Sequence, residues 1–383
     1  MIKTNLTIAL VLFYTMLMIS GCAGKTGKEQ YKVVGYVSGY RGYDVSRIDA
    51  AKLTHINYAF VNIIDGKINF GSDKIDDVER DKADITKLVD LKRTNPDLKV
   101  IVSVGGWGWS GNFSDAALTD SSRNRFAESA VAFLSEYNLD GIDLDWEYPN
   151  QVGAGNIFRP EDVHNFTLLL ACLRAKLDSL SDATTGKRQY LLTIATGGDS
   201  TYVANTELGE AAKYLDFINL MTYDYHNGAT FQAGHHSNLH LSEFDTWNGD
   251  ATDRSVTMHI AAGVPVSKIN IGVPFYGRRW KRVEPVDNGL YRKAGTAGQG
   301  IPYTEVLKAL SDPGFTRYYD TSAAAPYLWN AKDSVFISYD DEVSIAEKMK
   351  YVKSMHLGGV MFWEYTEDTD GRLLKAIIKG LRN

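Results

Sequence analysis

The stretch that decides the fold is Asp140-Gly141-Ile142-Asp143-Leu144-Asp145-Trp146-Glu147-Tyr148-Pro149. Side chains on a β-strand point alternately to its two faces. Three acids therefore share one face of a predicted strand and three apolar residues share the other, namely Asp143, Asp145 and Glu147 against Ile142, Leu144 and Trp146. In a closed barrel the apolar face can pack against outer helices, while the acids climb the interior toward the C-terminal rim, where barrel active sites lie.

Working outward from this strand, seven further segments are apolar, rich in β-branched and aromatic residues, and often closed by glycine or a polar residue. The predicted strands are Lys32–Tyr40, Thr54–Asn62, Lys99–Trp107, Gly141–Tyr148, Tyr190–Thr196, Phe217–Tyr225, Lys268–Tyr276 and Gly358–Tyr365. Helical patterns between them include Asp84–Arg93, Ser121–Tyr137, Glu161–Leu180, Thr252–Ala262 and Asp341–Met355. This alternation predicts an α/β protein with a (β/α)8 TIM barrel. An open doubly wound sheet is the alternative, but no glycine-rich dinucleotide turn follows the first strand.

One segment, residues 279–339, breaks the alternation because no long helical pattern lies between strand seven and the last of these helices. It is rich in aromatic residues, from Trp280 to Phe336, and it is too long and too apolar for a plain loop. We expect a small α+β insertion after strand seven, on the rim that carries the acids.

The N-terminal residues 1–22 have the pattern of an export signal: Lys3 is followed by the apolar run Ile8–Ile19, which is short for a membrane span. The run ends in Ile19-Ser20-Gly21-Cys22, which resembles a bacterial lipobox and implies cleavage and lipidation at Cys22. A plain secretory signal with an accidental cysteine is the alternative. We expect residues 23–30 to be a tether, residues 31–383 to form the barrel, and the protein to be exported and lipid-anchored to the bacterial cell membrane, at the outer membrane or cell surface.

The composition is that of an ordinary globular protein, 44% hydrophobic and 23% charged with a net charge of −6. No long basic run appears, so nothing indicates a nucleic-acid partner. The only cysteine besides Cys22 is Cys172, inside an apolar helical run, and we expect a buried small hydrophobe rather than half of a disulfide.

The acids on the predicted strand are costly to bury, and crowded carboxylates cannot all ionise. At least one therefore holds a proton near neutral pH, as a general acid must, and Glu147 is nearest the rim with the longest reach. A structural ion-pair network is one alternative, but no basic residue is in phase on the strand. A divalent metal site is another, which would usually recruit ligands from neighbouring strands.

At these residues the sequence resembles glycoside hydrolase family 18, the chitinases and their relatives. The family signature Asp-x-x-Asp-x-Asp-x-Glu is met by Asp140, Asp143, Asp145 and Glu147. Four further family motifs occur in order along the chain, namely Ser103-Val104-Gly105-Gly106, Met221-Thr222-Tyr223-Asp224, Phe275-Tyr276-Gly277-Arg278 and Trp363. The resemblance extends from about Tyr31 to the C-terminus.

The resemblance implies a retaining glycoside hydrolase in which the substrate's own 2-acetamido group is the nucleophile. Glu147 would protonate the glycosidic oxygen and later activate water. Asp145 would orient the acetamido group, Asp143 would buffer the proton of Asp145, and Tyr223 would donate a hydrogen bond to the acetamido oxygen. No metal and no cofactor is expected.

The resemblance and the rim position also imply residues that contact sugar, with Trp363 as the floor under the sugar that is attacked. The predicted substrate-binding residues are Tyr36, Phe60, Ser103, Gly106, Trp107, Tyr148, Met221, Asp224, Tyr276, Arg278 and Trp363. Core packing is the alternative for Tyr36, Phe60 and Trp363, and loop packing for Trp107 or its neighbour Trp109.

The insertion resembles the α+β module that forms one wall of a deep cleft in many chitinases, which suits long substrate chains. We therefore expect a monomer that binds and hydrolyses β-1,4-linked N-acetylglucosamine polymers and oligomers, that is, chitin and chito-oligosaccharides. Alternatives are an endo-β-N-acetylglucosaminidase acting on N-glycans, a glycan-binding protein with an inactive barrel, and a hydrolase of peptidoglycan fragments.

Overall fold

The computed structural model describes residues 31–247 and 249–382. The predicted signal peptide, the lipidation of Cys22 and the tether over residues 23–30 lie outside the described residues. Within the described part, no helix is both long enough and apolar enough to cross a membrane.

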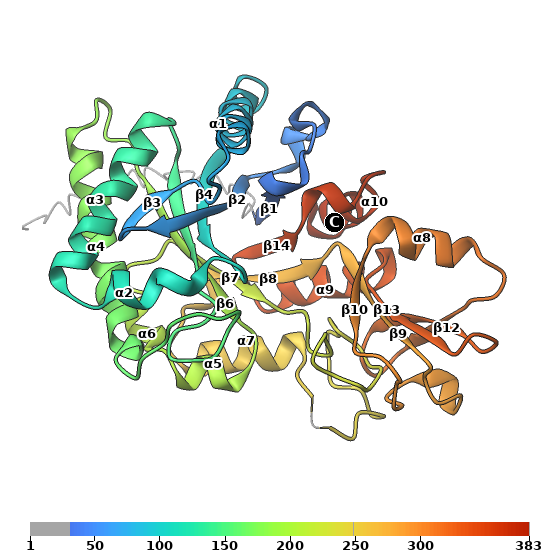
Figure 1. The fold of residues 1–383 in the computed structure, drawn as a ribbon. Coiled ribbons are helices and arrows are strands. Elements are labelled where there is room, and N and C mark those ends of the chain that lie inside the picture. The colour runs from blue at the N-terminus through green and yellow to red at the C-terminus, as the bar shows by residue number, and fades with distance from the viewer. Residues whose placement is uncertain (1–30, 248, 383) are drawn as a thin grey trace, which may run out of the picture. The chain divides into compact units, whose positions relative to one another are not determined.

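Eight parallel strands close into a barrel (Figure 1), which confirms the predicted TIM barrel. Around the barrel they are β1 (Lys32–Ser38), β2 (His55–Ile64), β4 (Lys99–Gly105), β5 (Gly141–Asp145), β6 (Leu191–Gly197), β7 (Phe217–Met221), β8 (Ile269–Pro274) and β14 (Gly359–Trp363). Strand β1 pairs with both β14 and β2 and so closes the sheet, and β3 (Lys67–Asn69) extends β2 as an antiparallel hairpin. Closure removes both sheet edges and fixes one end of the barrel as a rim of loops.

The helices follow the strands around the outside of the barrel (Figure 1). They are α1 (Ile75–Asp90), α2 (Phe113–Ala117), α3 (Asp120–Glu136), α4 (Asp162–Ala183), α5 (Ser200–Ala204), α6 (Leu208–Ala211), α7 (Thr252–Ala261), α9 (Glu342–Ser354) and α10 (Arg372–Arg382). In α3, Phe126, Ala130 and Leu134 recur every four residues and are all buried, as expected for a helix with one apolar face.

Helix α1 begins at Ile75, nine residues before the predicted start at Asp84, so that boundary was wrong. Its first two turns are highly charged and give no apolar periodicity. They carry ion pairs one turn apart, such as Arg80 with Asp77 at 2.7 Å, and Val78 packs against the core.

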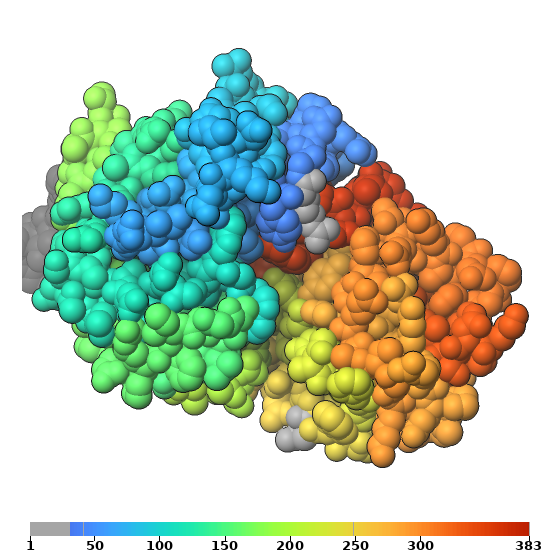
Figure 2. All heavy atoms as spheres, in the orientation of Figure 1, coloured from blue at the N-terminus to red at the C-terminus, as the bar shows by residue number. Residues whose placement is uncertain are grey.

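The insertion after β8 is an α+β unit, as predicted. A five-stranded antiparallel sheet, in the order β10-β9-β13-β12-β11, carries one helix. The elements are β9 (Tyr276–Lys281), β10 (Gln299–Pro302), α8 (Tyr303–Ser311), β11 (Thr316–Asp320), β12 (Ala325–Asn330) and β13 (Val335–Ser338). It has its own core around Trp280, Tyr327 and Phe336, which explains the aromatic content of the segment. Figure 2 shows the surface hollowed between this insertion, in orange, and the green loops of the barrel.

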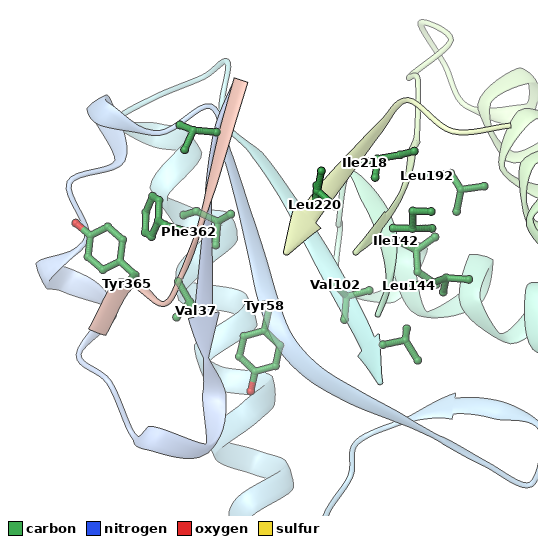
Figure 3. Close-up of a cluster of buried hydrophobic side chains, with 14 of the residues drawn as sticks. Val37, Tyr58, Val102, Ile142, Leu144, Leu192, Ile218, Leu220, Phe362 and Tyr365 are labelled. Atoms are coloured by element: carbon green, nitrogen blue, oxygen red, sulfur yellow. The ribbon is translucent and has the colours of Figure 1, made fainter. Parts of the chain in front are cut away.

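The two faces of β5 separate as the alternation predicts. Ile142 and Leu144 are fully buried in the layer between the barrel and its helices (Figure 3), where each contributes about 1.5–3 kcal/mol by leaving water. Trp146, just past the strand, stacks on Phe113 of α2 at a ring-centroid distance of 5.3 Å. The acids of the other face therefore enter the barrel interior.

Candidate active site

The described residues form a large cleft of about 1080 Å³ at the C-terminal rim, between the loops of the barrel and the start of the insertion. It brings together most of the residues singled out from the sequence: Tyr36, Phe60, Trp107, Asp145, Glu147, Tyr148, Met221, Tyr223, Asp224, Tyr276, Arg278 and Trp363. These residues come from seven separate stretches of the chain, so only barrel closure places them side by side.

Two residues predicted to bind substrate, Ser103 and Gly106, do not line this cleft. Ser103 is fully buried, and its hydroxyl donates to Asp143 Oδ2 at 2.7 Å. Gly106 has φ +74°, its N–H donates to the carbonyl oxygen of Asp145 at 2.8 Å, and a Cβ there would lie 2.5 Å from the ring of Phe60. Both residues therefore support other site residues rather than facing a ligand, and Asp143 likewise lies beneath the cleft lining.

Glu147 lies two residues beyond the end of β5 and faces the cleft with only 9% of its surface exposed. Its backbone N–H donates a hydrogen bond to Ser110 Oγ at 2.8 Å, which fixes the backbone at this position. The pKa of Glu147 is raised to about 7: burial is the main cause, a hydrogen bond with Tyr148 opposes the shift, and the negative charge of Asp224 adds to it. A carboxyl group with this pKa can hold a proton at mildly acidic pH and release it during a reaction.

Asp145 is the last residue of β5, two positions before Glu147, and is 3% exposed. Burial raises its pKa well above the ordinary value, and the neighbouring charges of Glu147 and Asp143 add to that shift. Its Oδ1 atom has no hydrogen-bond partner among the described residues, although it is buried. A buried carboxyl oxygen without a partner is costly, so this atom is available for a polar group of a ligand in the cleft.

Asp143 is fully buried and accepts hydrogen bonds from hydroxyl groups on three other strands. Tyr36 and Ser103 donate to Oδ2 at 2.8 and 2.7 Å, and Thr193 donates to Oδ1 at 2.5 Å. Burial raises the pKa of Asp143, while these three donors lower it. The carboxylate is thus supported by dipoles rather than by a positively charged side chain.

On the insertion side of the cleft, Asp224 forms a charged cluster with Arg278 and Tyr276. Its Oδ1 accepts from Tyr276 at 2.7 Å and from Arg278 Nε at 2.8 Å, and its Oδ2 accepts from Arg278 Nη2 at 2.5 Å. Burial alone would raise the pKa of Asp224, but His236 and Arg278 together hold it well below its usual range. The predicted sugar contacts Asp224 and Arg278 therefore bind each other and keep a fixed negative charge near Glu147.

Tyr223 projects into the same cavity from the end of β7. Burial raises the pKa of its phenol well above the ordinary value, so the hydroxyl keeps its proton. The hydroxyl contacts Met361 Sδ at 3.9 Å, a weak acceptor that an oxygen of a ligand would readily replace.

Aromatic rings form the floor and the rim of the cleft. Trp363 stacks on Phe60 with ring centroids 5.4 Å apart and planes 17° apart, and it also touches Tyr36 at 5.7 Å. Trp107 is 56% exposed on the rim, 6.5 Å from the ring of Tyr148. Exposed rings of this kind suit stacking on the apolar face of a sugar.

The sequence reasoning missed several lining residues in the rim loops: Tyr40, Val152, Asp199, Tyr225, Asn227 and Asp250. Trp109 also lines the cleft, where a Cβ on Gly71 would come within 2.1 Å of its ring. Their one common signal is position, because most follow a barrel strand within a few residues of its C-terminal end. Loop composition alone does not tell such a residue from an ordinary surface residue.

Neither alternative for the three acids finds support in residues 31–247 and 249–382. No group of three or more His, Cys, Asp and Glu in this part of the chain is arranged to hold a metal ion. Burial is the main cause of the raised pKa of both Asp143 and Asp145, and no positively charged side chain contributes to either shift. The arrangement therefore fits proton transfer in a closed site.

Comparison with known proteins places this site in context. The profile of the family described as Glycosyl hydrolases family 18 matches residues 32–368. Chitinase A1 of Niallia circulans is 41% identical over 404 residues, covering 90% of this chain and 58% of its own length. Chitinase B of Serratia marcescens is 31% identical, covering 88% of this chain and 78% of its own.

Solved structures agree with this result. A glycoside hydrolase family 18 N-acetylglucosaminidase from Paenibacillus barengoltzii is 44% identical with a TM-score of 0.84, covering 92% of this chain and all of its own. Chitinase ChiA74 from Bacillus thuringiensis is 33% identical with a TM-score of 0.84, covering 92% of this chain and 70% of its own.

Proposed function

The chain belongs to glycosyl hydrolase family 18, and we propose that it hydrolyses β-1,4-linked N-acetylglucosamine polymers and oligomers, that is, chitin and chito-oligosaccharides. One observation carries the proposal: three carboxyl groups stand in line from the barrel interior to its mouth, and burial raises the pKa of each. Charge of this kind is costly to a fold and useful to a reaction that moves protons.

In the first step Glu147 gives its proton to the glycosidic oxygen. The carbonyl oxygen of the substrate's 2-acetamido group attacks the anomeric carbon, the bond to the leaving oxygen breaks, and a cyclic oxazolinium ion forms. Asp145 accepts a hydrogen bond from the acetamido N–H and balances the positive charge as its own proton passes toward Asp143. The hydroxyl of Tyr223 donates to the acetamido oxygen and holds it in line for attack.

In the second step Glu147, now a carboxylate, removes a proton from a water molecule. The water oxygen attacks the anomeric carbon and the oxazolinium ring opens, which restores the acetamido group. The anomeric carbon is attacked twice from opposite sides in turn, so the configuration is retained. Glu147 ends the cycle with its proton restored.

The choice of substrate rests on the cleft. Aromatic rings on the floor and rim suit stacking on several sugars, and the insertion gives the cleft a second wall. The relatives named chitinase favour the same substrate over N-glycans, so the endo-β-N-acetylglucosaminidase alternative is not favoured.

The test is cleavage of chitopentaose and of a high-mannose glycopeptide side by side, using residues 23–383 and the Glu147→Gln variant. Release of chitobiose by the wild type and not by the variant supports the proposal. Cleavage of the glycopeptide alone would move the substrate to N-glycans.

We further propose that the protein is a monomeric lipoprotein, exported and held in the bacterial cell membrane through Cys22. The support is the sequence Ile19-Ser20-Gly21-Cys22 after an apolar run. Expression in a bacterium with a labelled fatty acid tests it, because the label should enter the wild type and be lost in Cys22→Ser. Labelling that is equal in both would overturn the anchor.

A further inference from the structure

A layer of polar side chains crosses the barrel interior at the level of Asp143, beneath Asp145 and Glu147. Seven of the eight barrel strands each contribute one residue, and all seven residues are at most 2% exposed: Tyr36, Asn57, Ser103, Asp143, Thr193, Asn219 and Asn270. Barrel interiors are usually filled by branched apolar residues. A polar layer here requires a reason, because each buried polar group costs stability unless it is hydrogen-bonded.

Four members of this layer form a single chain of hydrogen bonds that ends on a catalytic carboxylate. Asn270 Nδ2 donates to Asn219 Oδ1 at 3.1 Å, and Asn219 Nδ2 donates to the hydroxyl oxygen of Tyr36 at 3.1 Å. That hydroxyl donates to Asp143 Oδ2 at 2.8 Å. The chain thus links β8, β7, β1 and β5 across the barrel.

The direction of the chain follows from the chemistry of its members. An ionised Asp143 can only accept, so the single phenolic proton of Tyr36 must point toward it. Tyr36 then has only lone pairs to offer, so Asn219 must turn its NH₂ group toward the phenol and its carbonyl toward Asn270. Every dipole along the chain therefore presents its positive end to the carboxylate, and such chains strengthen each bond by polarising its neighbour.

We propose that Asn219 and Asn270 are positioning residues that orient and polarise the phenol of Tyr36, so that Asp143 stays an anion able to receive the proton of Asp145. This inference rests on the proposed function, in which that proton transfer occurs. Asn219 and Asn270 are fully buried and are not part of the cleft lining, so they act on the substrate only through Tyr36 and Asp143.

The groups that face Tyr36 and Asp143 allow the effect of Asn219 and Asn270 on the protonation of Asp143 to be measured separately. The titratable groups that act on the pair are Asp145 on β5 and Tyr223 after β7. From the strands that pack around the pair, the facing polar side chains do not titrate: Asn57, Ser103, Thr193, Asn219 and Asn270. A change in the pH profile that follows substitution of Asn219 therefore reports on the carboxyl pair.

The experiment measures kcat and KM on a chromogenic chitobioside between pH 3 and pH 9 for the wild type and for Asn219→Leu, which has the same branched arrangement of side-chain heavy atoms and no donor. Loss of the donor weakens the support of the anion, so Asp143 binds a proton at higher pH and the acid limb of kcat moves upward. We expect a shift of about half to one pH unit, with KM nearly unchanged.

Graded variants separate this role from a purely structural one. Tyr36→Phe should shift the acid limb most and Asn270→Leu least, because the latter lies one bond farther from Asp143. In a Tyr36→Phe background, Asn219→Leu should add no further shift, since the phenol through which it acts is gone. Asn270→Leu also keeps the test open if Asn219→Leu does not fold.

Thr196→Val is the matched control, because Thr196 is also fully buried on a barrel strand but bonds to His259 at 3.1 Å instead of to this chain. It should lower stability without moving the pH profile. If the pH profile of kcat for Asn219→Leu or Asn270→Leu superimposed on that of an active wild type, the positioning role of these residues would be overturned. A wild type that is itself inactive on chitobioside and chitopentaose would overturn the proposed function instead.

Discussion

The two ends of strand β5 carry the same kind of residue in opposite electrostatic settings. At the N-terminal end, Asp140 pairs with Lys92 and with Arg188, the latter at 2.8 Å, and also accepts from the N–H of Val100 at 2.7 Å. Burial alone would raise its pKa, yet these partners bring it below the ordinary value. At the C-terminal end, burial raises the pKa of Asp145 and of Glu147.

The difference lies in the partners and not in the residue type or in burial. Asp140 is 5% exposed and Glu147 is 9% exposed, so both are removed from water to a similar degree. Only Asp140 is surrounded by positive charge. Its contacts with Val100 on β4 and with Arg188, just before β6, hold these segments at the base of the barrel. One end of the strand is thus built for stability and the other for proton transfer, as in other TIM barrels.

The largest expected effect is on catalysis at the rim. Glu147→Gln keeps the shape of the side chain and removes its proton, so kcat on chitopentaose should fall by about 10²–10⁴-fold. Binding of the oligosaccharide, measured by calorimetry, should be nearly unchanged. Asp140→Asn is the matched control at the other end of β5 and should keep most of the kcat of each folded molecule. Comparable losses in the two variants would remove the distinction between the ends.

Asp145→Asn should reduce kcat by about 10²–10³-fold, as removal of one preorganised electrostatic contact typically does. An amide there can no longer balance the charge that develops on the acetamido group. A matched substrate without the acetamido group should not distinguish this variant from the wild type. If Asp145→Asn and the wild type also had similar kcat values on the acetylated substrate, assistance by the acetamido group would be contradicted.

The pH dependence of activity is the next effect in size. Because burial places the pKa of Glu147 at about 7, kcat/KM should fall about tenfold per pH unit above that value, as the acid loses its proton. Steady-state rates on a chromogenic chitobioside between pH 5 and pH 9 measure this limb. A plateau that continued to pH 9 would show that another group supplies the proton.

The smallest effects concern stability, where the two ends should respond with opposite sign. Below pH 4.5 Glu147 is protonated in both the folded and the unfolded chain, so its burial costs little. As the pH rises through 7, the buried carboxyl group must ionise, which lowers the free energy of unfolding. Glu147→Gln should therefore be more stable than the wild type at pH 8 by about 1–3 kcal/mol. Because the folded state lowers the pKa of Asp140, this carboxylate stabilises the fold at pH values above the ordinary aspartate pKa, and the stabilisation is lost as the pH falls into the acid range. Asp140→Asn should therefore be less stable at pH 7 by about 1–3 kcal/mol.

Urea unfolding at pH 4, 7 and 8 measures both changes in the free energy of unfolding. If both variants were destabilised to the same degree at pH 8, the acids at the rim would be structural like the one at the base.

How far the sequence could predict this molecule depends on how local each signal is. The period-two alternation around Asp143, Asp145 and Glu147 is local, so the strand, its faces and the acids follow from it directly. The start of α1 at Ile75 could not be found in the same way, because the apolar residues that pack on the core, such as Ile85 and Leu88, lie mainly in the second half of the helix, while its first two turns are highly charged.

Contacts between distant segments were beyond the sequence. Asp224 and Arg278 were each expected to contact sugar and both line the cleft, but the sequence did not show that these two residues, 54 positions apart, bind each other. Ser103 and Gly106 belong to a recognisable motif, yet only the closed barrel places one beside Asp143 and the other against Phe60. Asp199 and Asp250 line the cleft through loop conformations that no periodicity encodes.

The most direct test of this account is an infrared titration of the carboxyl groups, taken as the difference between the wild type and Glu147→Gln. The C=O stretch of a protonated carboxyl group marks the proton on Glu147 itself, without reference to any substrate. The account predicts a band that disappears with a midpoint of about pH 7. A midpoint near 4.5, the ordinary value for glutamate, would contradict the claim that the rim of the barrel holds a proton for catalysis.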